Sequence, residues 1–155
     1  MMDVLRFIMT ETAKGGAAGR KKALKEMPVI EKNDVPLEEI DQVIKSTENG
    51  APVLYLFFKK GSFDIAEVAT DNCTIHLNAA TVVKALIGFM SVYYSFHVGY
   101  APEHESFLYF MQSAFIGDTK LPQRVSVGVT KLLYSFNLQL KAVKESRGYK
   151  RLCVI

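Results

Sequence analysis

The chain has 155 residues, 49% hydrophobic content, a formal net charge of +3 and two cysteines. This length suits one ordinary domain, and the apolar content is enough to close a core without metal or disulfide support. Because Cys73 and Cys153 make no disulfide framework, the composition excludes a small disulfide-rich secreted protein and favours an intracellular one, cytoplasmic or nuclear. The longest apolar run, residues 82–98, contains Lys84 and His97 and is shorter than the roughly 20 residues that span a bilayer, so we expect no membrane span.

Charge is distributed unevenly along the chain. Residues 1–27 carry a net charge of +3, residues 28–122 carry −6, and residues 123–155 carry +6. Basic ends favour anionic partners such as nucleic acid, although solvated ends that keep the chain soluble explain the same pattern. The candidate anion contacts are Arg20, Lys21, Lys22, Lys25, Lys144, Arg147, Lys150 and Arg151.

We expect three regions along the chain. Residues 1–30 form a flexible basic leader, residues 31–141 a single α+β domain, and residues 142–155 a basic tail. Residues 12–23 hold three glycines among small and basic residues, a composition that orders poorly. Within the leader, residues 2–10 suit a short amphipathic helix, but the sequence indicates no surface against which it packs.

The first predicted element of the domain is a helix that begins near Asp34 and ends at Asn49-Gly50. The Asp34 side chain suits an N-cap, and the proline two residues later suits a first helical turn. The inner face of this helix consists of Leu37, Ile40 and Ile44.

Three strands that form a small antiparallel meander are expected next. Residues 52–58 are rich in β-branched and aromatic side chains and are followed by a Lys-Lys-Gly-Ser turn. Residues 63–69 alternate as a half-exposed strand. Residues 73–77 suit a third short strand with Cys73, Ile75 and Leu77 on one face.

Two helices then form a predicted hairpin. The first is capped by Asn78, runs to about Gly99, and is apolar except for a stripe of polar or small residues, which are Lys84, Gly88, Ser91 and Ser95. The second spans residues 102–117, and its apolar stripe is Phe107, Phe110, Met111 and Ala114. Over residues 122–140 the valines alternate as in a strand, but the apolar spacing and the preceding proline favour a helix. The expected fold is α+β, a small antiparallel meander packed against a helical hairpin plus one or two further helices.

No residue pattern indicates catalysis or a resident cofactor. The sequence contains no Walker loop, G-x-G-x-x-G, H-E-x-x-H or G-x-S-x-G motif. The one conceivable zinc set is poor, because strand alternation sends Cys73 and His76 to opposite faces; the set is Cys73, His76, His97 and His104. Glu103, His104 and Glu105 fit a helix start better than an acid/base cluster. We therefore expect no catalytic, cofactor-binding or metal-binding residue.

The helical hairpin carries an aromatic-rich segment. It runs Tyr93-Tyr94-Ser-Phe96-His97-Val98-Gly-Tyr100-Ala-Pro102 and continues as Phe107-Leu108-Tyr-Phe110-Met111-Gln112. This segment is similar to an uncharacterised animal domain, in which an aromatic pair, Phe-Asn, a Tyr-Pro step and a Phe-Leu-Gln helix recur near the C-terminus of multidomain or transposon-associated proteins. The similarity covers roughly residues 52–136, with His97 where Asn is usual and Ala101 inside the Tyr-Pro step. The resemblance implies an α+β interaction module with no catalytic role.

Three functional hypotheses follow. The leading one is a non-enzymatic protein–protein interaction or oligomerisation module, because the chain has abundant core and no catalytic pattern. The alternative is an electrostatic nucleic-acid-binding accessory protein that uses its basic ends and loses affinity as salt rises. The third is a thiol enzyme that pairs Cys73 with a nearby histidine.

Overall fold

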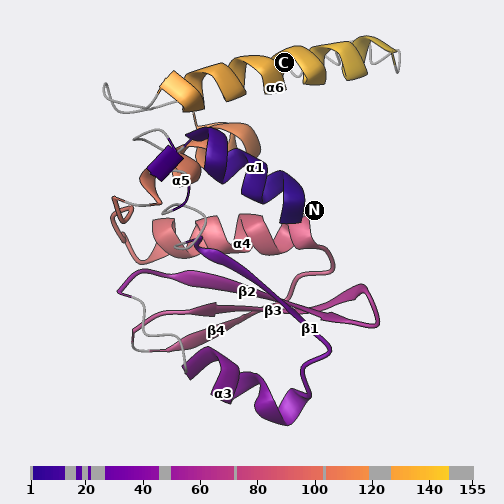
Figure 1. The fold of residues 1–155 in the computed structure, drawn as a ribbon, viewed down its shortest axis with the longest axis vertical. Coiled ribbons are helices and arrows are strands. Elements are labelled where there is room, and N and C mark those ends of the chain that lie inside the picture. The colour runs from indigo at the N-terminus through magenta and orange to yellow at the C-terminus, as the bar shows by residue number, and fades with distance from the viewer. Residues whose placement is uncertain are drawn as a thin grey trace, which may run out of the picture.

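A mixed sheet lies between helices on both of its faces in the computed structural model (Figure 1). The structure describes residues 2–12, 17–18, 21, 27–45, 50–71, 73–102, 104–118 and 127–146. Within these residues the sheet has four strands, in the order β1 (Val29–Asn33), β2 (Val53–Lys59), β3 (Ser62–Ala69) and β4 (Thr74–Leu77). β1 is parallel to β2, and the other two pairs are antiparallel. The α+β class and the meander β2–β3–β4 are therefore confirmed, and β1 is an additional strand that the sequence did not indicate.

The central strand β2 is buried on both faces. One face packs on helix α3 (Ile40–Lys45) through a cluster made by Ile40, Ile44, Val53, Tyr55 and Phe57. The other face places Leu54 and Leu56 in the main core, under helix α4 (Val82–Ser95). Double burial explains why β2 is a continuous apolar run, since a strand with one wet face alternates instead. The described part of the crossover from β1 to β2 contains a short 3-10 turn, η1 (Leu37–Glu39), and α3.

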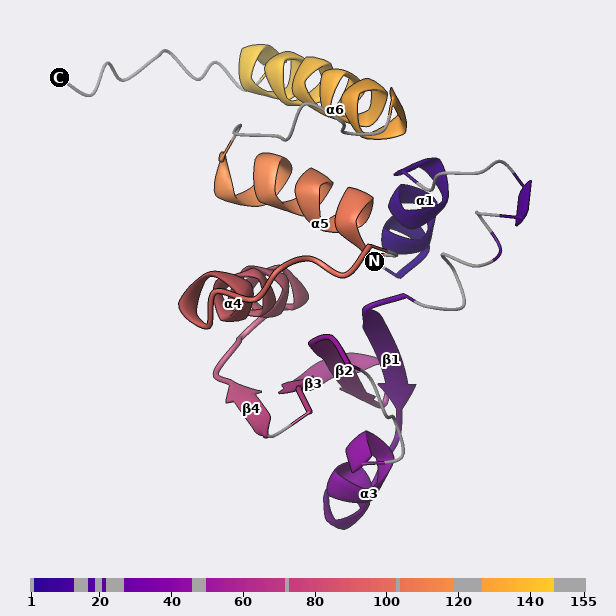
Figure 2. The same ribbon diagram turned by 90° about the vertical axis from the view of Figure 1, so that its left-hand side faces the viewer.

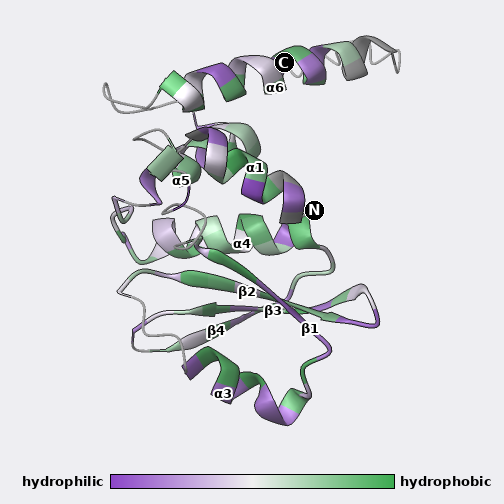
Figure 3. Cartoon of the chain, viewed as in Figure 1, coloured by the Kyte–Doolittle hydropathy of each residue, from purple (hydrophilic) through white to green (hydrophobic). Residues whose placement is uncertain are grey.

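Further helices stack above α4 (Figures 1 and 2). Helices α1 (Met2–Thr12) and α5 (Glu105–Met111) form the next layer, and α6 (Val127–Ser146) covers both of them. The apolar colouring of β2 and most of α4 contrasts with α1 and α6, where apolar and polar residues alternate along the helix (Figure 3). None of the described helices combines the length and apolar character needed to cross a membrane.

The assignment of residues 1–30 to a flexible leader is wrong for two of its segments. Residues 2–12 form α1, and its Leu5, Ile8 and Met9 are buried in the main core. Val29, also in the predicted leader, is the first residue of β1 and is buried. The amphipathic pattern of residues 2–10 correctly predicted a helix. The helices that α1 packs against, α5 and α6, lie more than 90 residues away in the sequence, so no local pattern could identify them.

Asp34 ends β1 rather than capping a helix. Its backbone is in the left-handed region (φ 52), and its carboxylate accepts a hydrogen bond of 2.8 Å from the Lys60 amide. Lys60 and Gly61 also have positive φ, as a two-residue hairpin turn between β2 and β3 requires. The helical segment begins later, at Leu37, and Leu37 itself is 62% exposed, whereas Ile40 and Ile44 are buried as expected.

Another boundary also differs from the sequence prediction. The N-cap of α4 is Thr81, whose hydroxyl accepts from the Lys84 amide, and not Asn78. β3 is half exposed along part of its length, as expected: Asp64 is exposed, and Ile65 and Ala69 are only partly buried against the α3 cluster. Ala66 and Val68 are buried in the main core.

The later helices follow the sequence prediction more closely. Phe107, Phe110 and Met111 are buried along α5, which continues as a short π-helix, η2 (Gln112–Ile116), and ends at Gly117 with φ 79. Residues 127–140 are helical, within α6, as the spacing favoured. The first residues of that predicted segment, 122–126, lie outside the described residues.

The core position of α1 predicts that Leu5→Ala destabilises the protein by about 2–5 kcal/mol, as large-to-small substitutions in packed cores do. Phe7→Ala is the matched control, because Phe7 is on the same helix but exposed; it should change the free energy of unfolding by less than about 0.5 kcal/mol. Urea unfolding followed by circular dichroism measures both. Equal stability of wild type and Leu5→Ala would show that α1 is not part of the core.

Candidate functional site

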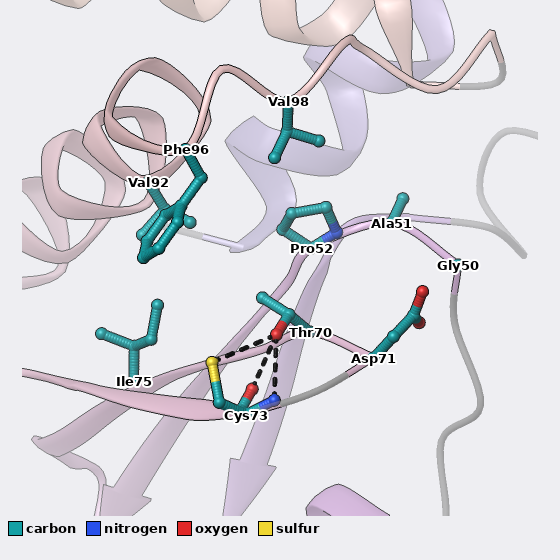
Figure 4. A pocket seen from close by; sticks show the side chains of 10 residues that line it. All are labelled: Gly50, Ala51, Pro52, Thr70, Asp71, Cys73, Ile75, Val92, Phe96 and Val98. Atoms are coloured by element: carbon teal, nitrogen blue, oxygen red, sulfur yellow. Dashed lines mark hydrogen bonds between the residues drawn. The ribbon is translucent and has the colours of Figure 1, made fainter.

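An apolar pocket of about 290 Å³ opens where the sheet ends beneath the last turn of α4 (Figure 4). We call it the sheet-end pocket. Pro52 before β2, Thr70 after β3 and Cys73 before β4 supply its lower wall, and Val92 and Phe96 supply its upper wall. The chain brings these residues together because the antiparallel meander places the start of β2, the end of β3 and the start of β4 at one end of the sheet.

The polar groups of Thr70 and Cys73 in the sheet-end pocket bond to each other, and Asp71 adds a carboxylate to the lining. The Thr70 hydroxyl donates to the Cys73 carbonyl at 2.9 Å and accepts from the Cys73 amide at 3.2 Å. The Thr70 oxygen also lies 3.4 Å from the Cys73 sulfur. Because most of the lining is apolar and the groups of Thr70 and Cys73 are already partnered, this part of the pocket suits an apolar occupant, which needs no hydrogen bonds there.

A second, shallower hollow lies on the other side of the segment that follows α4. We call it the tyrosine hollow; it has a volume of about 370 Å³ and is lined by Tyr93, Tyr94, His97, Val98, Gly99, Tyr100 and Tyr109. Val98 lines both hollows, and Phe96 lines the sheet-end pocket. Tyr94, Phe96 and Val98 are all exposed, Phe96 by 61%. These three residues, which we call the corner, form an exposed apolar ridge between two hollows.

A partly buried polar network fixes the segment after α4 to η2. Gln112, only 6% exposed, accepts a hydrogen bond of 2.9 Å from the Tyr100 hydroxyl and donates one of 3.0 Å to the Asp118 carboxylate. The Tyr94 hydroxyl donates to the same carboxylate at 3.4 Å. Edge-to-face ring contacts join Tyr100 to Tyr93 and to Tyr109, with centroids 5.2 and 5.0 Å apart. The corner is thus held by packing and hydrogen bonds on its inner side while its apolar side chains face solvent.

The pKa values of Tyr94, Tyr100 and Tyr109 are raised above that of free tyrosine. Burial is the main cause that raises the pKa of Tyr100 above its ordinary value, and the neighbouring Tyr94 adds to it. Burial likewise raises the pKa of Tyr109, with the Glu105 carboxylate as the second cause. The hollow therefore presents neutral phenols rather than phenolates near neutral pH.

The residues of the conceivable zinc set lie apart. Cys73 lines the sheet-end pocket, whereas His76 is on the opposite face of β4 and lies 2.8 Å from Glu67. His97 follows α4 with a left-handed backbone (φ 51), and His104 is buried just before α5. Among the described residues no three histidine, cysteine or carboxylate side chains converge as a metal site would need. No described histidine lines the pocket of Cys73.

The other predicted site residues are only partly described. Glu105 lies in the first turn of α5, as expected for a carboxylate near a helix start, and Glu103 lies outside the described residues. Lys21 is exposed, and Lys144 belongs to α6. The remaining candidate anion contacts lie outside the described residues; they are Arg20, Lys22, Lys25, Arg147, Lys150 and Arg151.

Comparison with protein-family models, with curated proteins and with solved structures finds no match to this chain. The corner lies in the aromatic-rich segment of the sequence, whose apolar residues we expected to pack within the helical hairpin. In the structure α4 ends at Ser95, before the predicted end near Gly99, so Phe96 and Val98 lie beyond the last helical residue and are exposed.

The raised pKa of Tyr100 predicts how stability changes at high pH. The stabilisation by the neutral phenol is complete below about pH 10, the unfolded-state value, and is lost as pH rises toward the higher folded-state pKa. Tyr100→Phe should be less stable by about 1 kcal/mol at neutral pH, since it loses the bond to Gln112. Above pH 10 its free energy of unfolding should fall less steeply than that of wild type. Urea unfolding across this pH range checks both effects, and parallel pH profiles would contradict them.

Proposed function

We propose that this chain is a non-enzymatic protein–protein interaction module whose partner docks an apolar side chain at the corner. The observation that carries the proposal is the exposed Phe96 at the edge of the apolar sheet-end pocket. Interface hot spots are enriched in aromatic side chains and pair with well-packed pockets. The corner combines both elements within a few residues, with Tyr94 and Val98 beside Phe96.

The rigidity of the corner supports an interaction role. The Phe96 amide donates a hydrogen bond to the Val92 carbonyl, and the Val98 amide donates one of 3.0 Å to the Tyr93 carbonyl. Tyr100 is anchored through Gln112. A surface that is already ordered loses little conformational entropy when a partner docks, so more of the contact energy appears as affinity.

The resemblance stated from the sequence supports the same proposal. The segment similar to the animal domain includes every residue of the corner, and the implied role of that domain is interaction. We include an intracellular location in the proposal, because Cys73 is a free thiol and free thiols persist in reducing compartments.

A paired substitution tests this function. Phe96→Asp places a charge at the sheet-end pocket. In affinity purification from native cells, this variant should recover at least about tenfold less of the specific partners than wild type does. Leu37→Asp is the matched control, since Leu37 is equally exposed (62%) but lies beside α3, on the other side of the sheet; it should retain those partners. Both variants should keep the circular dichroism spectrum of wild type.

A partner identified in this way is then titrated against the purified chain. The proposal requires weaker binding to Phe96→Asp than to Leu37→Asp. Equal recovery and equal affinity with both variants would rule out the corner as the docking surface.

A further inference from the structure

We infer that β4 pairs antiparallel with β4 of a second copy of this chain, so that two four-stranded sheets join into one. The inference goes beyond the corner interface and does not depend on it, because it rests on the backbone edge of β4. β4 is an outer strand of the sheet, hydrogen-bonded only to β3 among the described strands. Outer strands present unpaired amides and carbonyls that are ready to pair with another chain.

The hydrogen bonds of β3 and β4 identify which groups point outward. The Thr70 amide donates to the Cys73 carbonyl at 2.9 Å, so these two residues form a hydrogen-bonded pair. Bonded and non-bonded pairs alternate in an antiparallel ladder, which makes Val68 with Ile75 the next bonded pair. The amides and carbonyls of Thr74 and His76 therefore point away from β3, and within the described part of the chain no hydrogen bond reaches them.

The two outer strands differ in their protection against such pairing. β1 carries Glu31 and Lys32 in its centre, and charges on an edge discourage association. Residues 73–77, by contrast, contain no lysine, arginine, carboxylate or proline. β4 is the unprotected edge.

A two-fold arrangement uses all of the outward groups. If Thr74 lies opposite His76 of the second copy, the two strands exchange four hydrogen bonds, two on each side of the axis. Ile75 then faces Ile75 of the second copy, and Cys73 faces Leu77 of the second copy. These side chains lie on the α4 side of the sheet, where Ile75 and Leu77 are already half-buried against the core.

Charge favours this orientation over the parallel one. Asp71 lies at the start of the β4 edge and Lys84 near its end, in the first turn of α4; both are exposed. Gly88 of α4 lies directly above β4, since a Cβ on this glycine would be only 3.1 Å from the Leu77 side chain. Lys84 lies one helical turn before Gly88 and is therefore on the same face of α4, above β4. Antiparallel pairing brings Asp71 of each copy to the Lys84 end of the other. Parallel pairing would place like charges together.

Sedimentation of the full chain from micromolar to millimolar concentration tests the inference. Wild type should form a reversible dimer. Thr74→Pro removes an outward amide from each copy without removing a bond to β3, and it should raise the dissociation constant at least about tenfold. Thr74→Val keeps the amide and has nearly the same shape, so it should dimerise as wild type does.

A charge exchange tests the orientation. Asp71→Lys and Lys84→Glu should each weaken the dimer, and the double variant should restore it. Loss of dimerisation in both singles and in the double variant would contradict antiparallel pairing, whereas rescue supports it.

A disulfide tests the register. With Cys73 and Cys153 replaced by serine, Ile75→Cys should form an intermolecular disulfide on mild oxidation, because residue 75 faces itself across the axis. Thr74→Cys in the same background is the control and should not crosslink efficiently. A wild-type chain that stays monomeric at millimolar concentration, or equal crosslinking of the two variants, would overturn the inference. The proposal of the corner interface is contradicted only if Phe96→Asp still binds the partners of the wild type, so the two proposals are tested separately.

Discussion

Burial of β2 between two layers is the constraint on which the rest of the structure depends. Its alternate residues pack on α3 and on α4, so a change of register by one residue would exchange the two cores. The parallel pairing with β1 follows from this arrangement, because a parallel connection needs a crossover and α3 is that crossover. The four-stranded sheet has two outer strands, β1 and β4. The side chains on each outer strand determine whether another strand can pair with it.

The same arrangement creates the corner. β2 and β4 begin, and β3 ends, at one end of the sheet, and α4 terminates above that end. Within the part of the chain that the structure describes, no further layer covers the residues that follow α4, so Phe96 and Val98 are exposed while Tyr93 and Tyr100 are fixed on the inner side. A well-ordered apolar ridge beside a pocket therefore results from where the helix ends and requires no special loop.

Local sequence signals predicted the meander, the helix α5 with its buried stripe, and the helical state of residues 127–140, because each has a clear periodicity or a strong boundary residue. Local signals missed β1, whose five residues are mostly polar and become a strand only by pairing with β2. They also misplaced the start of α3, since the Asp34 carboxylate bonds to the distant Lys60 amide instead of capping a helix. The exposure of Phe96 depended on the packing of elements far apart in sequence, and no local pattern distinguishes it from a core aromatic.

Hydrogen exchange at single-residue resolution, measured at micromolar and at millimolar protein concentration, tests whether a doubly buried β2 leaves β4 as an edge open to pairing. The β2 amides should exchange slowly at both concentrations. The amides of Thr74 and His76 should exchange rapidly in the dilute protein and slowly in the concentrated protein. Equal exchange of these two amides at both concentrations, or rapid exchange within β2, would contradict this arrangement.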